Sequence, residues 1–213
     1  MIDIYPKEGE RSFFAGKTGT DKTTTMILMG SRFWGDYQIQ VLATKEDKMI
    51  LALPVPIVRT IHDLKKYPFP EYPMVVYYPD GNELHDQDIL DGWCEWIFQR
   101  GNTVAIIDEL TQVAYGTMPK PGFLNMYTRG RSQNVTVLAG NQRPVSVPAI
   151  VYTEAENFYK FYLGWNKDRE KVMQFTTNAM ATQVKDKYGF HYYNPNRSND
   201  VYYISNLMKG VKT

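Results

Sequence analysis

Residues 13–24 of the chain read FFAGKTGTDKTT, and this stretch does most to decide the fold. A short apolar run from Phe13 to Ala15 enters a loop with two glycines and leaves it into a helical pattern from Lys22 to Gly30. A strand, a glycine-containing turn and a helix in this order form a cradle for the phosphates of a nucleotide. Loop N–H groups and the positive end of the helix dipole face the phosphates there. The stretch therefore predicts a phosphate-binding loop.

The side chains of this loop have distinct expected roles. Lys22 is expected to reach the β and γ phosphates as a point charge, and the Thr23 hydroxyl is expected to bind Mg²⁺. The full set expected to contact the nucleotide is Gly16, Lys17, Thr18, Gly19, Thr20, Asp21, Lys22, Thr23 and Thr24.

One position departs from the pattern Gly-x-x-x-x-Gly-Lys-[Ser/Thr], because Asp21 stands where the second glycine belongs. A carboxylate there adds negative charge beside the phosphates, unless it points away or pairs with a base such as Lys17. Aspartate tolerates left-handed backbone better than most residues, so the loop geometry can survive. Taken alone, this motif leaves open whether the loop binds any ligand.

A second motif lies at residues 103–109, where the apolar run TVAII is followed by Asp108 and Glu109. Buried parallel strands carry ligand-handling groups at their carboxyl ends. Asp108 is expected to hold Mg²⁺ through water or the Thr23 hydroxyl, and Glu109 to polarise the attacking water as general base. Either motif alone fits an ordinary strand and turn, but both in this order indicate a nucleotide-hydrolysing site.

A third motif, at residues 127–144, reads YTRGRSQNVTVLAGNQRP. Its apolar strand can lie beside the strand that ends in Asp108, so Gln142 is expected to face the γ phosphate. Arg129 and Arg131 precede the strand and lie at its opposite end, from which they could stabilise transition-state charge on a neighbouring subunit's nucleotide as an arginine finger. At least one of these two arginines is expected to be an ordinary solvated residue.

Apolar runs alternate with helical stretches along the chain, which predicts an α/β fold with a mainly parallel sheet flanked by helices. Prolines between residues 53 and 73 indicate an irregular connection, and residues 118–122 read as a loop. Residues 188–206 alternate aromatic and polar side chains and predict a C-terminal β-hairpin. The expected strands are 12–15, 38–43, 74–78, 103–108, 134–139 and 158–163, and the expected helices are 22–30, 86–100 and 168–175.

Length and composition limit the number of domains and the kinds of binding site that the chain can contain. The 213 residues favour a single domain, with an N-terminal segment (1–10), a nucleotide-binding core (11–165) and a C-terminal helix and hairpin (166–213). Because the net charge is +1, any DNA contact must come from local patches. Cys94 is the only cysteine, which excludes an internal disulfide and a cysteine-rich zinc site. No apolar run approaches the roughly 20 residues of a membrane-spanning helix.

Together the three motifs resemble the FtsK/HerA superfamily of ring ATPases, and in particular the genome-packaging ATPases of tailless, membrane-containing icosahedral viruses. The resemblance is carried by residues 16–23, by residues 106–109, and above all by Arg129-Gly130-Arg131 followed by a strand and Gln142-Arg143-Pro144, with Asn141 in place of a threonine. It implies a RecA-like P-loop NTPase core, ATP and Mg²⁺, and a homo-oligomeric ring of five or six subunits. It further implies two kinds of partner, double-stranded DNA and a capsid or viral membrane protein at a packaging vertex. The location that it implies is the host cytoplasm and the virion.

The leading hypothesis is therefore an Mg²⁺-dependent ATPase that pumps a double-stranded DNA genome into a preformed capsid, with Glu109, Lys22, Gln142, Arg129 and Arg131 as catalytic residues. One alternative is a non-hydrolysing scaffold protein with a degenerate phosphate loop, and another is a plasmid or conjugative DNA pump of the same superfamily. A small nucleotide kinase would need an arginine-rich lid, which the sequence lacks. The candidate DNA contacts are Lys120, Lys185, Lys187, Arg197 and Lys209.

Overall fold

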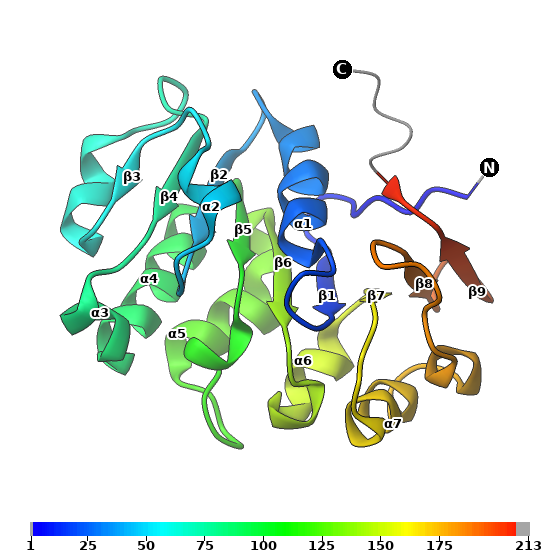
Figure 1. Cartoon of the computed structure of the whole chain (residues 1–213). Helices are drawn as coiled ribbons and strands as arrows, with labels where there is room; N and C mark the ends of the chain where they lie inside the picture. Colours follow the sequence, from blue (N-terminus) through cyan, green and yellow to red (C-terminus); the bar gives the residue numbers. More distant parts are fainter. Residues whose placement is uncertain (1, 208–213) are drawn as a thin grey trace.

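A nine-stranded sheet runs through the computed structural model of the chain, which describes residues 2–207 (Figure 1). Its strand order is β3-β4-β2-β5-β6-β1-β7-β8-β9. The strands from β3 to β7 in this order pair in parallel, and β8 and β9 add an antiparallel hairpin. The bounds are β1 Arg11–Ala15, β2 Gln38–Leu42, β3 Ile57–Val58, β4 Met74–Tyr77, β5 Thr103–Ile107, β6 Val135–Asn141, β7 Asn157–Lys160, β8 Phe190–Asn194 and β9 Ser198–Ile204. The expected α/β fold with a C-terminal hairpin is confirmed.

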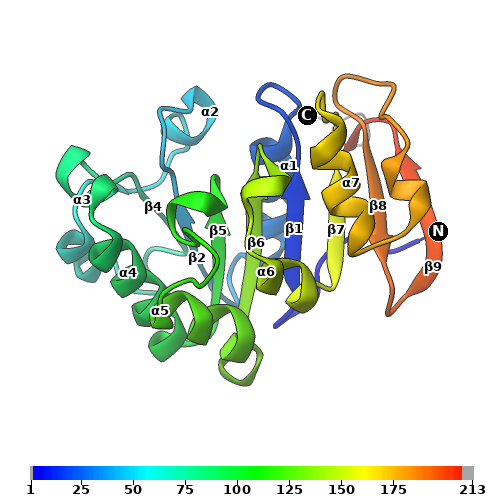
Figure 2. The same cartoon turned by 90° about the horizontal axis from the view of Figure 1, so that it is seen from below.

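Helices cover both faces of this sheet. Helix α1 (Lys22–Gly30) packs on one face, and α4 (Gln87–Arg100), α5 (Pro121–Leu124), α6 (Ala149–Glu154) and α7 (Asn166–Gln174) lie on the other (Figure 2). Two one-turn helices, α2 (Lys48–Leu51) and α3 (Gly81–His85), follow β2 and β4. Each face buries its own apolar cluster, so the central strands are covered on both sides. The ends of the central strands therefore remain accessible.

Local sequence explains the helix that is clearest from the pattern, α4. The Asp86 side chain accepts hydrogen bonds from two backbone N–H groups of the first turn, and Gly101 ends the helix with a φ of +65°. Between them, Leu90, Trp93 and Ile97 recur at helical spacing and are fully buried against the sheet.

Two segments differ from their expected conformation. Residues 53–73 were expected to be irregular, yet they contribute the two-residue edge strand β3, which pairs with β4. Pro121 and Gly122 were expected to lie in a loop, but they open α5, because proline is well suited to the first turn of a helix. The helix then continues as a π-helical turn, Asn125–Arg129, up to the arginine motif.

The topology brings the three motifs to one edge. Strand β6 lies between β1 and β5, with Ala15 opposite Asn141 and Ile107 opposite Ala139. These three strands run parallel, so the residues that follow each of them emerge side by side at the carboxyl edge of the sheet.

Candidate active site

The turn between β1 and α1, residues 16–21, has the backbone conformation that a phosphate cradle requires. Gly16 is packed so closely that a Cβ there would lie 2.7 Å from the Cβ of Phe161, and Gly19 has a φ of +78°. Asp21 has a φ of +62°, which is the left-handed conformation usual for glycine. The substituted position thus keeps a glycine-like backbone.

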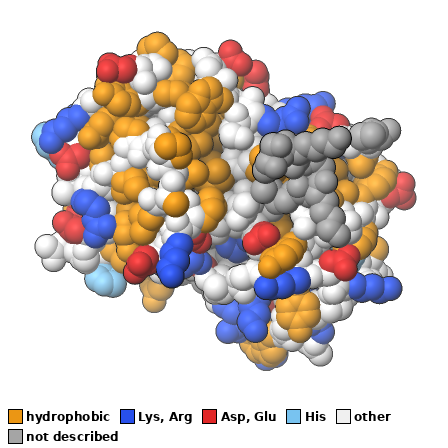
Figure 3. Space-filling view, turned by 45° about the horizontal axis from the view of Figure 1, so that its top comes forward, with side chains coloured by type: hydrophobic (Ala, Val, Ile, Leu, Met, Phe, Trp, Pro, Cys, Tyr) orange, Lys and Arg blue, Asp and Glu red, His pale blue; other side chains and the backbone are white. Residues whose placement is uncertain are grey.

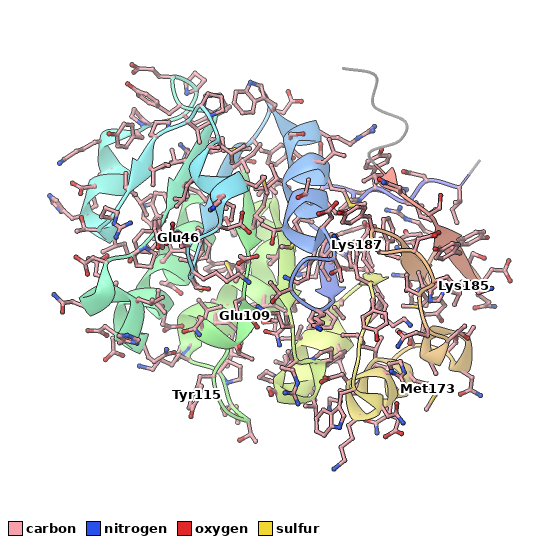
Figure 4. The ribbon with its side chains drawn as sticks, in the orientation of Figure 1. Glu46, Glu109, Tyr115, Met173, Lys185 and Lys187 are labelled. Carbon is pink, nitrogen blue, oxygen red and sulfur yellow. The ribbon has the colours of Figure 1, made fainter. Side chains whose placement is uncertain are left out.

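The Asp21 carboxylate lies at the start of α1. Partial burial raises its pKa, and the positive charge of Lys187 opposes that shift. Lys187, rather than the Lys17 suggested by the sequence, is therefore the base whose charge acts on Asp21. Lys187 belongs to the segment before β8, which lies beside α1 and the turn (Figure 4).

The first two motifs meet at Asp108, which is fully buried. The Thr23 hydroxyl donates a hydrogen bond of 2.5 Å to Oδ1 of Asp108, and Nζ of Lys22 lies 3.8 Å from the same oxygen. Burial lowers the pKa of the Lys22 ammonium, and the Asp108 carboxylate opposes that effect. The site thus holds a desolvated lysine and a carboxylate in contact, at the position where the sequence predicts the terminal phosphates.

Glu109 follows directly at the carboxyl end of β5 (Figure 4). Its Oε1 accepts hydrogen bonds from the backbone N–H of Gln142, at 3.3 Å, and from the Thr111 hydroxyl, at 3.4 Å. Its Oε2 is buried and has no hydrogen-bond donor among residues 2–207. Glu109 is therefore oriented by one oxygen and leaves the other able to accept a proton.

Gln142 joins the third motif to this site. Its Oε1 accepts a hydrogen bond of 2.7 Å from the Thr18 hydroxyl, so its side chain reaches the turn after β1. Asn141 beside it is fully buried, and its side chain bonds to the backbone of Thr111 and Arg143. The Asn141 side chain therefore holds the backbone after β6 in place, and the Gln142 side chain faces the turn after β1.

A cavity of about 210 Å³ lies between the turn after β1 and the segment after β2. Most of the loop residues predicted from the sequence line it, while Gly16 packs under the loop and the Thr20 hydroxyl bonds back to the carbonyl of Lys17. The lining residues are Lys17, Thr18, Gly19, Asp21, Lys22, Thr23, Thr24, Lys45, Asp47 and Met49.

The sequence did not predict Lys45, Asp47 and Met49 in this lining, and of these Lys45 contacts the predicted carboxylates. Its Nζ lies 3.1 Å from Oδ2 of Asp108 and 4.0 Å from Oε2 of Glu109. The signal in the sequence was its place just after the expected strand 38–43, because every parallel strand ends at the same edge. The missing information was that β2 lies next to β5.

Arg129 and Arg131 lie at the other edge of the sheet, before β6. This strand has seven residues, which at about 3.3 Å each separate the two ends by roughly 20 Å. Arg131 forms an ion pair with Glu156, whereas the Arg129 guanidinium has, among residues 2–207, a 3.4 Å contact with Asn125 and lies over the ring of Phe98. Neither arginine reaches the cavity of its own chain.

The candidate DNA contacts are dispersed. Lys120 pairs with Asp88, and Arg197 is largely buried in pairs with Glu10 and Asp3, so Arg197 tethers the N-terminal segment and is not part of a basic cluster with Lys185 and Lys187. Lys209 lies outside the described residues. On the face in Figure 3, Lys and Arg side chains lie in several separate groups, most of them beside acidic side chains.

The residues around Asp108 fit a magnesium ion. Mg²⁺ in nucleotide sites takes one or two protein oxygens and completes its shell with phosphate and water oxygens. The Thr23 hydroxyl and the Asp108 carboxylate supply two such oxygens in contact with each other. Within residues 2–207 there is no group of three His, Cys, Asp or Glu side chains that could hold a metal without such help.

Sheet order and site geometry together define a RecA-like P-loop NTPase fold. The solved structures similar to this chain include the genome-packaging NTPase B204 of Sulfolobus turreted icosahedral virus 2. In complex with AMPPCP it matches with a TM-score of 0.69 and 16% identity, over 94% of this chain and 100% of that chain. In complex with sulfate it matches with a TM-score of 0.73 and 15% identity, over 93% and 97%.

The conjugation coupling protein TcpA of pCW3 matches with a TM-score of 0.64 and 12% identity, over 93% of this chain and 60% of that chain. No protein-family model and no curated protein matches the sequence. The likeness to FtsK/HerA-type ATPases expected from the three motifs is thus confirmed for the fold. In the described part of the chain, no helix has the length and apolar character to cross a membrane.

Proposed function

We propose that this chain is an ATPase that moves double-stranded DNA, and that it packages a viral genome into a preformed capsid. The observation that carries the proposal is the meeting of Lys22, Thr23 and Asp108 within 3.8 Å at the carboxyl edge of the sheet. Glu109, next to Asp108 at the end of β5, and Gln142, at the end of β6, adjoin this group. The likeness in fold to a genome-packaging NTPase supports the choice of DNA as the substrate that is moved.

Each side chain has one task in the proposed hydrolysis. Backbone N–H groups of the turn after β1 bind the phosphates, and Lys22 places its charge on the terminal ones. Glu109 accepts a proton from the attacking water at Oε2, while Oε1 stays fixed by the backbone of Gln142. The Thr23 hydroxyl and the Asp108 carboxylate would hold Mg²⁺, which would supply positive charge to stabilise the negative charge that develops on the phosphates.

Asp21 does not favour the alternative of a scaffold protein with a degenerate loop. Its backbone adopts the left-handed conformation that the missing glycine would supply, and Lys187 opposes its charge. The loop therefore keeps its shape, and the electrostatic cost of the carboxylate is reduced. A binding-competent loop is what an ATPase requires.

The two arginines extend the proposal to a ring of five or six subunits. Because they lie at the edge opposite the nucleotide, one of them acts on the nucleotide of the adjacent subunit. In this proposal the ring encloses the DNA, docks on a capsid or viral membrane protein at a packaging vertex, and works in the host cytoplasm and the virion.

The ATPase rate, measured with and without double-stranded DNA and beside the oligomeric mass, tests this function. We expect Mg²⁺-dependent hydrolysis that DNA stimulates, together with a mass of several subunits when nucleotide and DNA are present. A monomer that neither binds nor hydrolyses ATP under any of these conditions would refute it.

A further inference from the structure

Lys45 is one of two lysines that approach the buried carboxylate of Asp108. It follows β2, and its ammonium lies 3.1 Å from Oδ2 of Asp108, while the Thr23 hydroxyl and Lys22 approach Oδ1. The two oxygens of this buried carboxylate thus have different partners. Oδ2 has no partner other than the Lys45 ammonium in the described chain.

This contact is not an ordinary surface ion pair. Exposed pairs contribute little, because both partners are already solvated. Here the Asp108 side chain is fully buried and that of Glu109 is 14% exposed, whereas Lys45 is 35% exposed and lines the cavity. The partly exposed lysine thus approaches both carboxylates from the cavity.

The charges of the four ionised side chains around Asp108 balance before any nucleotide is present. Lys22 and Lys45 supply two positive charges, and Asp108 and Glu109 supply two negative ones. A triphosphate would add several negative charges to the same cavity, which Lys45 lines together with Lys17 and Lys22. A flexible ammonium between carboxylates and phosphates will redistribute toward the larger negative charge.

We propose that Lys45 is a tethered cation of the nucleotide site: it neutralises Asp108 and Glu109 in the empty site and moves onto the terminal phosphates when the nucleotide binds. This proposal rests on the proposed nucleotide-binding function and deepens it. In this proposal a metal bound at Asp108 competes with the Lys45 ammonium for the same carboxylate and displaces it. The displaced ammonium then adds a second lysine contact to the phosphates, beside Lys22.

The loss of Lys45 has two expected consequences, and both increase the dependence of nucleotide binding on magnesium. Without magnesium, the loss of Lys45 removes a phosphate-binding cation, so nucleotide affinity falls. With magnesium, the loss of Lys45 also removes the group that competes with the metal for Asp108. The metal then binds more tightly, and this restores part of the lost nucleotide affinity. The ratio of the dissociation constants measured without and with magnesium should therefore rise when Lys45 is neutralised.

Calorimetric titration with a non-hydrolysable ATP analogue, in EDTA and in magnesium, measures this ratio. We expect Lys45→Met to raise it at least tenfold above wild type. Lys45→Arg, which keeps the charge, should stay within about threefold of wild type. Lys48→Met is the matched control, because Lys48 is an exposed lysine on the following helix. It should leave the ratio unchanged.

The outcomes separate the two proposals. If wild type binds the analogue and Lys45→Met has the wild-type ratio, Lys45 has no role at the phosphates and the inference is overturned. If wild type binds the analogue under neither condition, the proposed function itself fails. Circular dichroism and thermal unfolding of each variant show whether it is folded, and Lys45→Arg carries the comparison should Lys45→Met not fold.

Discussion

The Thr18 hydroxyl donates a 2.7 Å hydrogen bond to the side-chain carbonyl of Gln142, and this bond joins the turn after β1 to the end of β6. The same two side chains lie where the proposed function needs a group that responds to the γ phosphate. A phosphate oxygen would compete with Gln142 for the Thr18 hydroxyl. Nucleotide binding would therefore break this contact, and release of the γ phosphate after hydrolysis would restore it.

Replacement of Gln142 should uncouple hydrolysis from binding. Gln142→Ala removes the side chain and keeps the backbone N–H that holds Glu109. We expect analogue affinity within about threefold of wild type and a DNA-stimulated ATPase rate lowered at least tenfold, measured by titration and by phosphate release. Gln133→Ala, an exposed glutamine before β6, is the control. Wild-type stimulation in Gln142→Ala would rule out the assigned role.

Glu109→Gln should abolish hydrolysis while nucleotide still binds. The amide keeps the shape of the side chain but cannot accept the proton of the attacking water, a role usually worth about 10²- to 10⁴-fold in rate. We expect a loss of at least 100-fold in phosphate release and an unchanged or tighter dissociation constant for ATP. Substantial activity in this variant would remove Glu109 as the base. Glu95→Gln, on α4 away from the cavity, serves as control.

Asp21→Asn should strengthen nucleotide binding. Asparagine tolerates the left-handed backbone at φ +62° and removes the negative charge beside the phosphates. Near the protein surface this gain is on the order of 1 kcal/mol, or about fivefold in affinity. Lys187→Met should weaken binding in wild type and weaken it less in the Asp21→Asn background. Equal effects of Lys187→Met in both backgrounds would show that Lys187 does not offset Asp21, and Lys185→Met is the matched control.

Of the two arginines, Arg129 is the better candidate for the finger, because Arg131 is already paired with Glu156. We expect Arg129→Ala to lose ATPase activity at least tenfold and to bind analogue normally as a monomer. Mixed with Glu109→Gln subunits, it should regain part of the activity, since some interfaces then combine an intact arginine with an intact base. Arg131→Ala should mainly lower thermal stability. No recovery on mixing would argue against action across an interface.

Lys160 should make stability depend on alkaline pH. It is fully buried at the end of β7, donates to the carbonyl of Thr182, and faces His191 across the strands and Arg169, with no carboxylate as partner in the described chain. Burial lowers its pKa to about 8 from 10.5, so between these values the unfolded chain binds the proton and the folded chain does not. The charged lysine therefore penalises folding below pH 8, and stability rises as the pH increases from 8 to 10.5.

Urea unfolding of wild type and Lys160→Met across this range measures the effect. The free energy of unfolding of wild type, minus that of the variant, should increase by at most about 1.4 kcal/mol per pH unit. Lys185→Met, at an exposed lysine, should show no such trend relative to wild type. A difference that stays flat from pH 8 to 10 would contradict the lowered pKa.

The sequence predicted the parts of the site that are local in the chain. The turn before Lys22 and the run before Asp108 each combine a strand pattern with the polar residues that follow it, so neighbours in sequence are enough to recognise them. Lys45 and Lys187 escaped because their relevance depends on which strands and segments lie side by side, namely β2 beside β5 and the segment before β8 beside α1. The spacing of residues along the chain does not indicate which strands and segments are neighbours in space.

Two features of the fold could not be predicted from the local sequence either. Pro121 was taken as a mark of a loop, although proline fits the first turn of a helix as well as a bend. The short strand β3 has only two residues, too few for an alternating pattern, and only its pairing with β4 identifies it. Long elements with a clear period, such as α4 and β6, appeared close to where they were expected.

The burial of β6 limits how the two edges of the sheet can communicate. All seven of its residues are buried, and it bonds to β1 on one side and β5 on the other. A slip by one residue would exchange the side chains of its two faces, and a slip by two would break every pairing at once. The strand is therefore fixed in register, so a displacement of Arg129 at one end would reach Gln142 at the other through a movement of β6 together with β1 and β5.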